Sequence, residues 1–256
     1  MTAWMQTGRG RPIDLLAPDL GSLDVAAEIA WPLAGLARFN AHQASNGPGS
    51  REPIYSVAQH CVVGADAVLE ETRSPAAALA FLVHDAHEAP IGDVTTPTAQ
   101  ALEEYVATAL AHVFGLDAAA RVRAAFGQGL VAAALAGLKA RLDAHIHPLA
   151  GLPPALPPHL ARIVREMDLR MLDLERRQIL GPTRLPPGEA IWTEAVRKAE
   201  PVRIRGRLRP WPRHKAAAEW MERWERWRIR RTDPVAPLEP TPRDGADAFA
   251  RLWADR

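Results

Sequence analysis

Most of this chain consists of alanine- and leucine-rich segments whose apolar residues recur at the spacing of an α-helix. A period of about 3.6 residues predicts amphipathic or buried helices. Alternating runs of β-branched residues, which are typical of strands, are scarce, and clusters of proline and glycine separate the segments. The sequence therefore predicts an all-α fold, with turns where those clusters lie.

The expected helices follow from these segments and from their start signals. Ser56 fits the N-cap position of one helix, and Ser74 followed by Pro75 is the pattern of an N-cap with proline in the first turn. The stretch 43–53, rich in glycine, proline and serine, is expected to be an exposed, mobile loop. We expect helices over about 24–37, 56–71, 75–84, 97–114, 116–126, 130–144, 159–180 and 188–198.

The character of the chain changes after residue 180. Residues 1–180 contain all the candidate site residues discussed below, so we expect them to form the catalytic domain, with 181–256 as a C-terminal extension. The parts of this extension are a basic tract (203–215), an amphipathic helix with Trp220, Trp224 and Trp227 on one face, a proline-rich linker (232–244) and a short final helix (246–254). The tryptophan face is expected to dock that helix on the core or on another subunit.

Composition sets only broad limits. With 256 residues, 48% of them hydrophobic, the chain can bury a sizeable core. A formal net charge of +1 does not favour nucleic acid or an acidic surface as a partner. The single cysteine excludes an internal disulfide and fits a reducing compartment. Because no signal peptide or apolar stretch of membrane-spanning length is visible, we expect a cytoplasmic protein without membrane contact.

The dipeptide His84-Asp85 points most directly to a function. It follows the apolar run 76–83 and opens a stretch rich in carboxylates, with Glu88 one helical turn later. Polar groups at the end of a buried helix are costly unless they are paired or bind a metal ion. Both side chains can reach one ion at the end of the helix, and a mononuclear site then needs further ligands from other elements.

Two residues far away in the sequence can complete such a site. His60 is the one histidine of an otherwise apolar segment, and Asp168 lies among apolar residues of the segment 159–180. A lone helical histidine is more often a hydrogen-bonded core residue, and Asp168 alone also has a structural explanation, but the combination favours metal binding. We expect His60, His84, Asp85 and Asp168 to bind one divalent ion, which could be Mn, Co, Ni, Fe, Zn or Mg.

These four residues match the pattern H…HD…D, and the chain resembles the HD-domain metal-dependent phosphohydrolases. The segment from His84 to Pro97 is similar to the HDxxExxxGDxxxP segment of bacterial and phage HD-domain 5′-deoxyribonucleotidases. Arg38-Phe39-Asn40, upstream of His60, resembles the arginine and aromatic segment of the same proteins. The resemblance extends over about residues 6–180 and implies a helical bundle with the metal ion in its centre.

The resemblance also implies a chemistry, the hydrolysis of phosphate esters by a metal-activated water. Glu88 is then expected to orient or deprotonate that water; the alternative is that it only holds His84 in place. The resemblance places Asp93 near the deoxyribose, whereas a carboxylate in such a turn could also cap a helix.

Arg38 is the expected phosphate clamp, because a guanidinium offers two parallel donors to phosphate oxygens. Phe39 is expected near the sugar or base. The nucleotidase relatives tend to have tryptophan there, so the choice of sugar stays open. Arg9 and His42 are weaker candidates for substrate contact.

The remaining histidines and the cysteine are not expected to add ligands. Some HD proteins bind a second metal ion through two extra histidines between the HD dipeptide and the last aspartate. His87, His112, His145, His147 and His159 lie in that interval, but their local sequences do not match that pattern. Cys61 is expected to be a buried, inert thiol that faces away from the site.

The basic tract 203–215 has two interpretations. It is either a phosphate-binding arm for nucleic acid or a solvated segment that packs through Ile204, Leu208 and Trp211, and we favour the second. Nucleic acid is therefore not expected as a partner, and a homo-oligomer is left open.

The sequence thus predicts a metal-dependent phosphohydrolase of nucleoside 5′-phosphates, of the 5′-nucleotidase type, with a small nucleotide as its partner. Removal of phosphates from a dNTP by the same site is one alternative. A nucleotide- or RNA-binding protein with a vestigial HD site is an alternative of another class.

Overall fold

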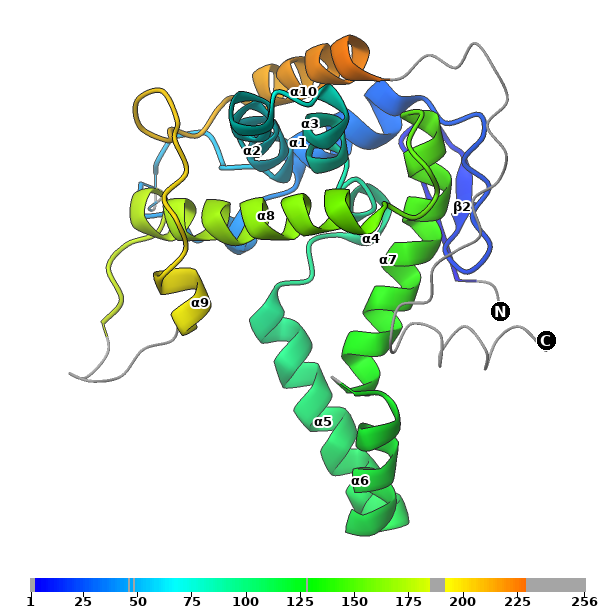
Figure 1. The fold of residues 1–256 in the computed structure, drawn as a ribbon. Helices are drawn as coiled ribbons and strands as arrows, with labels where there is room; N and C mark the ends of the chain where they lie inside the picture. The colour runs from blue at the N-terminus through cyan, green and yellow to red at the C-terminus, as the bar shows by residue number, and fades with distance from the viewer. Residues whose placement is uncertain (1–2, 46, 48, 128, 185–191, 229–256) are drawn as a thin grey trace.

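The computed structural model describes residues 3–45, 47, 49–127, 129–184 and 192–228, and it confirms the all-α fold (Figure 1). In chain order the elements are β1 (Trp4–Gln6), β2 (Pro12–Asp14), the π-helix η1 (Ala26–Ala30), α1 (Trp31–Gly35), the short turn η2 (Arg38–Ala41), α2 (Val57–Thr72), α3 (Pro75–Leu82), α4 (Glu88–Ile91), α5 (Thr96–Phe114), α6 (Leu116–Ala125), α7 (Leu130–Leu149), α8 (Pro158–Gln178), α9 (Glu194–Arg197) and α10 (Arg213–Trp227).

Most expected helices agree with these bounds to within a few residues. Ser56 and Ser74 are the N-caps of α2 and α3, and each hydroxyl accepts a hydrogen bond from the amide three residues later. Helix α7 continues to Leu149, beyond the expected end at 144. Of the helix expected over 188–198, the described residues show only α9; residues 185–191 and the expected elements at 232–244 and 246–254 lie outside the described part.

Three helices form the centre of the molecule. Helix α8 crosses it, with α2 and α3 packed against one side, and α1 and α10 lie beyond them (Figure 1). Helices α2 and α3 approach so closely at Gly64 that a Cβ there would lie 2.1 Å from the Phe81 ring. Only a glycine fits this position, because the Phe81 ring occupies the space that a larger residue would need.

The described part of the expected extension belongs to this same core. Trp220, Trp224 and Trp227 of α10 are buried against α2, α3 and their neighbours, and the Trp220 indole N–H donates to the carbonyl of Leu82 at 3.1 Å. The tryptophan face thus docks α10 on the core, which is one of the two expected outcomes. The expected boundary at residue 180 does not separate two cores, because α10 covers the side of α2 and α3 that α8 leaves open.

A short hairpin was not expected from the sequence. Strands β1 and β2 pair antiparallel, and their turn is held to η1 by a hydrogen bond from the Thr7 hydroxyl to Glu28 at 2.7 Å. Three-residue strands are too short to produce a recognisable alternation in the sequence.

Helices α5 and α6, with the start of α7, project away from the rest of the molecule (Figure 1). Glu103 of α5 holds this arm together by accepting hydrogen bonds from the amides of Leu130 and Val131, at 2.9 and 2.8 Å. Several large apolar side chains of the arm are exposed: Leu102, Tyr105, Val113, Phe114 and Leu116. Among the described residues, no helix combines the length and the apolar character that crossing a bilayer requires.

The stretch 43–53 is anchored at both ends. The Gln43 side chain is buried, donates to the carbonyl of Pro53 at 2.8 Å and accepts from the amide of Tyr55 at 2.8 Å. Most of the described residues between these anchors are exposed, as expected.

Candidate metal centre

His84 and Asp85 lie in a turn between α3 and α4, rather than on a continuous helix as expected. Helix α3 ends at Leu82, and the amides of His84 and Ala86 donate to carbonyls three residues back. Glu88 begins α4, so the expectation that it shares a helical face with His84 and Asp85 is wrong. The tight turn, not helical periodicity, sets the directions of these side chains.

All four expected ligands converge from three parts of the chain. Nε2 of His60, on α2, lies 3.3 Å from Oδ1 of Asp168, on α8. Nε2 of His84 lies 3.2 Å from Oδ2 of Asp85 and 3.8 Å from Oδ1 of Asp168. Nε2 of His60 also lies 3.9 Å from Oδ2 of Asp85. Ligand atoms of His60, His84 and Asp168 thus lie within 4.8 Å of one another, a separation that a single ion could bridge, and Asp85 lies beside both imidazole nitrogens.

The second nitrogen of each histidine is occupied. Nδ1 of His60 lies 2.6 Å from a carboxylate oxygen of Glu175, and Nδ1 of His84 lies 2.6 Å from the carbonyl of Phe81. Nε2 of both rings and Oδ1 of Asp168 are buried and without a hydrogen-bond partner in the described part of the chain. Histidines that bind metals have this arrangement, with one nitrogen donating to an oxygen and the other free to ligate. The donor set thus fits a metal ion.

Glu175 is the site residue that the sequence did not single out. Its side chain is fully buried, accepts a hydrogen bond from the Tyr55 hydroxyl at 2.8 Å and lies 3.3 Å from Arg38. It lies seven residues after Asp168, and therefore on the same face of α8. That spacing was the signal that could have revealed it.

Without a metal ion, charges within the cluster balance one another. Burial alone would raise the pKa of Asp85, but His84 and Arg38 hold it far below its usual range. Burial likewise opposes ionisation of Asp168, and His60 and His84 lower its pKa. Burial lowers the pKa of His84, but Asp85 and Asp168 more than offset this and raise it well above its usual value. The acidic neighbours thus favour a proton on His84, and a metal ion bound there would have to replace it.

Asp168 is less enclosed than its apolar neighbours suggested. Its Oδ1 is buried in the cluster, whereas 45% of the side chain is exposed. Helix α8 presents this residue at the edge of the core, so the cluster is accessible to solvent beside Asp168.

Arg38 lies at the cluster, as expected of a phosphate clamp. Its guanidinium is 3.4 Å from Asp85 and 3.7 Å from Asp168, and its Nε is buried without a partner among the described residues. Phe39 follows with a positive φ of 55°, and its ring packs beside the small cluster of Tyr55, Ile179 and Leu208. Asn40 and Ala41 also have positive φ, which is a strained conformation for non-glycine residues.

Glu88 is buried beside this cluster. One of its oxygens lies 3.6 Å from Nζ of Lys139, and the other has no hydrogen-bond partner in the described structure. Burial, together with the negative charges of Asp85 and Asp93, raises the pKa of Glu88 to about 8. Its carboxyl is therefore poised to exchange a proton near neutral pH.

Asp93 is half-buried near the same groups, and burial raises its pKa. It does not cap α5, since the N-cap residue of that helix is Thr95. The helix-cap alternative is thus wrong, and the role in sugar contact stays a prediction.

Among the other histidines, His87 is the one that approaches the centre. Its Nδ1 lies 2.9 Å from Asp143, its Nε2 is buried without a partner in the described region, and one ring nitrogen lies within 4.8 Å of oxygens of Asp85 and Glu88. Its local sequence predicts no role for it. His112, His145 and His159 are exposed.

Cys61 is buried, as expected, but it does not face away from the site. Its Sγ lies within 4.8 Å of His84 and Asp85, because the turn after α3 folds back over this part of α2. Burial raises the pKa of the thiol to about 11, so it stays protonated at neutral pH.

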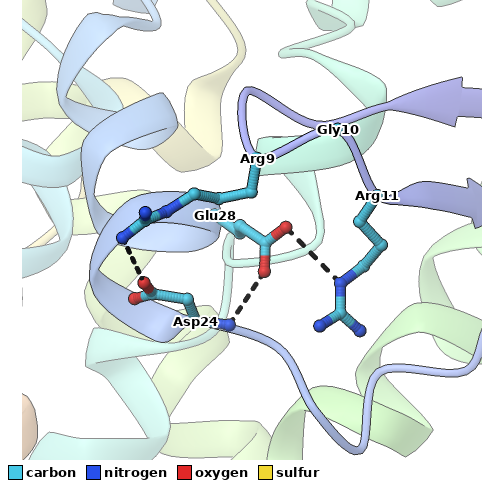
Figure 2. A pocket seen from close by; sticks show the side chains of 5 residues that line it. All are labelled: Arg9, Gly10, Arg11, Asp24 and Glu28. Carbon is cyan, nitrogen blue, oxygen red and sulfur yellow. Dashed lines mark hydrogen bonds and ion pairs between the residues drawn. The ribbon is translucent and has the colours of Figure 1, made fainter.

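Arg9 lies in a different pocket (Figure 2). There it pairs with Asp24 at 2.9 Å, while Arg11 lies 3.5 Å from Glu28, whose other oxygen accepts from the amide of Asp24 at 2.8 Å. These contacts hold the β1–β2 turn to η1. His42 follows the strained turn η2, and it is not one of the residues that meet at the cluster.

The fold and the site define an all-α protein with a buried histidine and carboxylate cluster that can hold a metal ion. No protein-family model matches the chain. A protein of Rhodobacter capsulatus, described as uncharacterized, is 32% identical over 222 residues, which cover 84% of this chain and 91% of the relative. The chain belongs to the same family as this Rhodobacter protein.

Proposed function

We propose that the protein is an HD-domain phosphohydrolase that uses one divalent ion to release phosphate from nucleoside 5′-phosphates. The observation that supports this most is the convergence of His60, His84, Asp85 and Asp168 at 3.2 to 3.9 Å, each histidine having its second nitrogen already bonded. Intact and convergent ligands argue against the alternative of a vestigial site. The same ligands would serve the hydrolysis of a dNTP as well as that of a monophosphate.

The four ligands would hold the ion, which supplies Lewis acidity and lowers the pKa of a water toward neutrality. Arg38 would bind a phosphate oxygen through the guanidinium nitrogens that now contact Asp85 and Asp168. Glu88, with its raised pKa, would accept the proton of the attacking water and return it to the leaving oxygen. Asp93 would accept a hydrogen bond from a sugar hydroxyl, and Phe39 would contact the sugar or base.

The test is a panel assay of phosphate release with Mn²⁺ or Co²⁺. Purified protein is incubated with deoxynucleoside monophosphates, ribonucleoside monophosphates and dNTPs, and the products are separated. Release of inorganic phosphate from a monophosphate supports the nucleotidase type, while release from dNTPs alone supports the alternative. His84→Ala is expected to lose its bound metal, as measured by elemental mass spectrometry. It is also expected to lose turnover. Equal turnover by the variant and the wild type would overturn the proposal.

A further inference from the structure

A groove lined by arginines runs along the side of α2, away from the ligand His60. It has a volume of about 680 Å³ and is formed by α2, the segment 203–211 and α10. Six arginines line it, against three carboxylates: Arg73, Arg203, Arg205, Arg207, Arg209 and Arg223 against Asp66, Glu70 and Glu219. This excess of positive charge is local, since the whole chain has a formal net charge of only +1.

The arginine segment is held firmly in place. Side-chain atoms of Gln59 bond the carbonyl of Arg209 at 2.7 Å and the amide of Trp211 at 2.8 Å, and Gln178 accepts from the amide of Leu208 at 2.8 Å. Leu208 is buried and Ile204 half-buried, as expected from the sequence. The segment is therefore a fixed part of the surface, packed as the favoured interpretation predicts.

This packing turns the arginines outward. On each side of Gly206, buried and exposed residues alternate, so that Arg203, Arg205, Arg207 and Arg209 are all exposed. The segment bends at Gly206, which has a φ of 78°, so this regular spacing holds only within each pair, Arg203 with Arg205 and Arg207 with Arg209. Alternate side chains of an extended chain are about 7 Å apart, which is similar to the spacing of phosphates along an extended nucleic-acid strand.

These arginines have no counter-charges of their own. Within the described residues, Arg223 pairs with Asp66 and Glu219, but the other five arginines of the groove make no ion pair. Arg223 can offset only one of these two carboxylates, so the six arginines and three carboxylates leave a formal charge of +3 on the groove. Guanidinium groups in such an array bind phosphates with two parallel hydrogen bonds.

The length of the groove indicates the kind of ligand. Its α2 residues extend from Gln59 to Arg73, which corresponds to about 20 Å of helix. A nucleoside triphosphate would fill only part of this length, whereas a strand of a few nucleotides would follow it. Trp211 lines the groove beside the arginines, and an aromatic ring among basic groups is typical of single-strand binding sites.

We propose that this groove binds the phosphate backbone of a single-stranded nucleic acid. The sequence alone favours a packed, solvated segment over a phosphate-binding arm for nucleic acid. The structure places them on one groove, fixed and unpaired. This site is separate from the metal cluster and does not depend on its activity.

The test measures the binding of fluorescein-labelled oligo(dT) and oligo(U) to the protein. Fluorescence anisotropy reports the binding, at several salt concentrations and with EDTA present. The triple variant Arg203→Gln/Arg205→Gln/Arg207→Gln is expected to bind the oligonucleotide at least about tenfold more weakly. The slope of the logarithm of the binding constant against the logarithm of the salt concentration should decrease in magnitude by about 2, because three phosphate contacts to a single strand are lost. Comparison of the two oligonucleotides distinguishes DNA from RNA.

The matched control removes the same charge elsewhere on the surface. Arg121→Gln/Arg123→Gln/Arg162→Gln changes exposed arginines outside the groove and is expected to bind like the wild type. His84→Ala is also expected to bind like the wild type, which separates this proposal from the proposed function. Equal loss in the control variant, tighter binding of a dNTP or of duplex DNA than of a single strand, or no binding at all would overturn the proposal.

Discussion

At the scale of single residues, Glu175 links the candidate ligand His60 to the substrate side of the site. It accepts from Tyr55, holds Nδ1 of His60 at 2.6 Å and neutralises part of the charge of Arg38. A carboxylate in this position makes the imidazole a stronger ligand, because it stabilises positive charge on the ring.

We therefore expect Glu175→Gln to weaken metal binding by about 10- to 100-fold while the fold is kept, because glutamine retains the shape but not the charge. Competition with a coloured chelator measures this change. Glu166→Gln, on the same helix with an exposed side chain, is the control and should bind metal like the wild type. Unchanged affinity in Glu175→Gln would show that this contact does not tune His60.

Glu88 gives a pH dependence with a defined sign. Its pKa in the metal-free fold is about 8, against about 4.3 in an unfolded chain. Between these values the folded protein binds more protons than the unfolded chain, so the free energy of unfolding decreases as the pH rises. The loss amounts to a few kcal/mol and is complete above the folded pKa.

The variant Glu88→Gln is expected to remove this part of the pH dependence. Thermal unfolding of metal-free protein, followed from mildly acidic to mildly alkaline pH, should show a smaller decrease of the melting temperature in the variant than in the wild type. Parallel curves for both proteins would contradict the raised pKa of Glu88. Glu194→Gln, whose carboxylate is exposed, should give the wild-type curve.

At the scale of elements, the close approach of α2 and α3 connects the fold to the site. The Phe81 ring fills the space above Gly64 and lies 4.4 Å from the His84 ring and 5.6 Å from the His60 ring, measured between centroids. The separation of these two helices therefore sets the positions of both candidate histidine ligands.

We expect Gly64→Ala to push Phe81 away, to lower the free energy of unfolding by about 1–3 kcal/mol and to weaken metal binding. Gly137→Ala on α7 is the matched control. A Cβ there meets nothing within 4 Å, and the higher helix propensity of alanine is expected to stabilise the protein by about 0.5–1 kcal/mol. Denaturant unfolding and chelator competition on both variants measure the two effects. A neutral Gly64→Ala would contradict the tight contact.

At the scale of the whole molecule, α10 closes the core that the upstream helices begin. Trp220 is fully buried and stacks on Trp224 with ring centroids 5.5 Å apart, although it lies more than 130 residues after Leu82, whose carbonyl its indole N–H binds. The described residues after 192 thus contribute to the same hydrophobic core as α2 and α3.

Trp220→Ala is accordingly expected to cost about 3–5 kcal/mol of unfolding free energy, because it leaves a large cavity beneath α2 and α3. Urea unfolding measures this loss, with Trp4→Ala as control, since 58% of Trp4 is exposed. A loss of unfolding free energy close to that of the control would indicate that α10 contributes little to the core.

The sequence by itself determined the helices, their caps and the four candidate ligands. Helical periodicity and N-cap chemistry are local, so Ser56 and Ser74 could be read directly. The ligands could be named because His84-Asp85 is conspicuous at the end of an apolar run. For the helices and their caps the structure agrees, and it brings the four candidate ligands close to one another, although His84-Asp85 lies in a turn.

Only the tertiary structure decided which distant residues meet. Several contacts join residues that are far apart along the chain or depend on a turn, and no local periodicity predicts them. They are the contact of Glu175 with His60, the approach of Cys61 to His84 and the burial of Trp220. The same holds for the basic tract. Its sequence allowed either a nucleic-acid-binding arm or a packed, solvated segment, and the packing of Leu208 and the hydrogen bonds to Gln59 place its arginines along one groove.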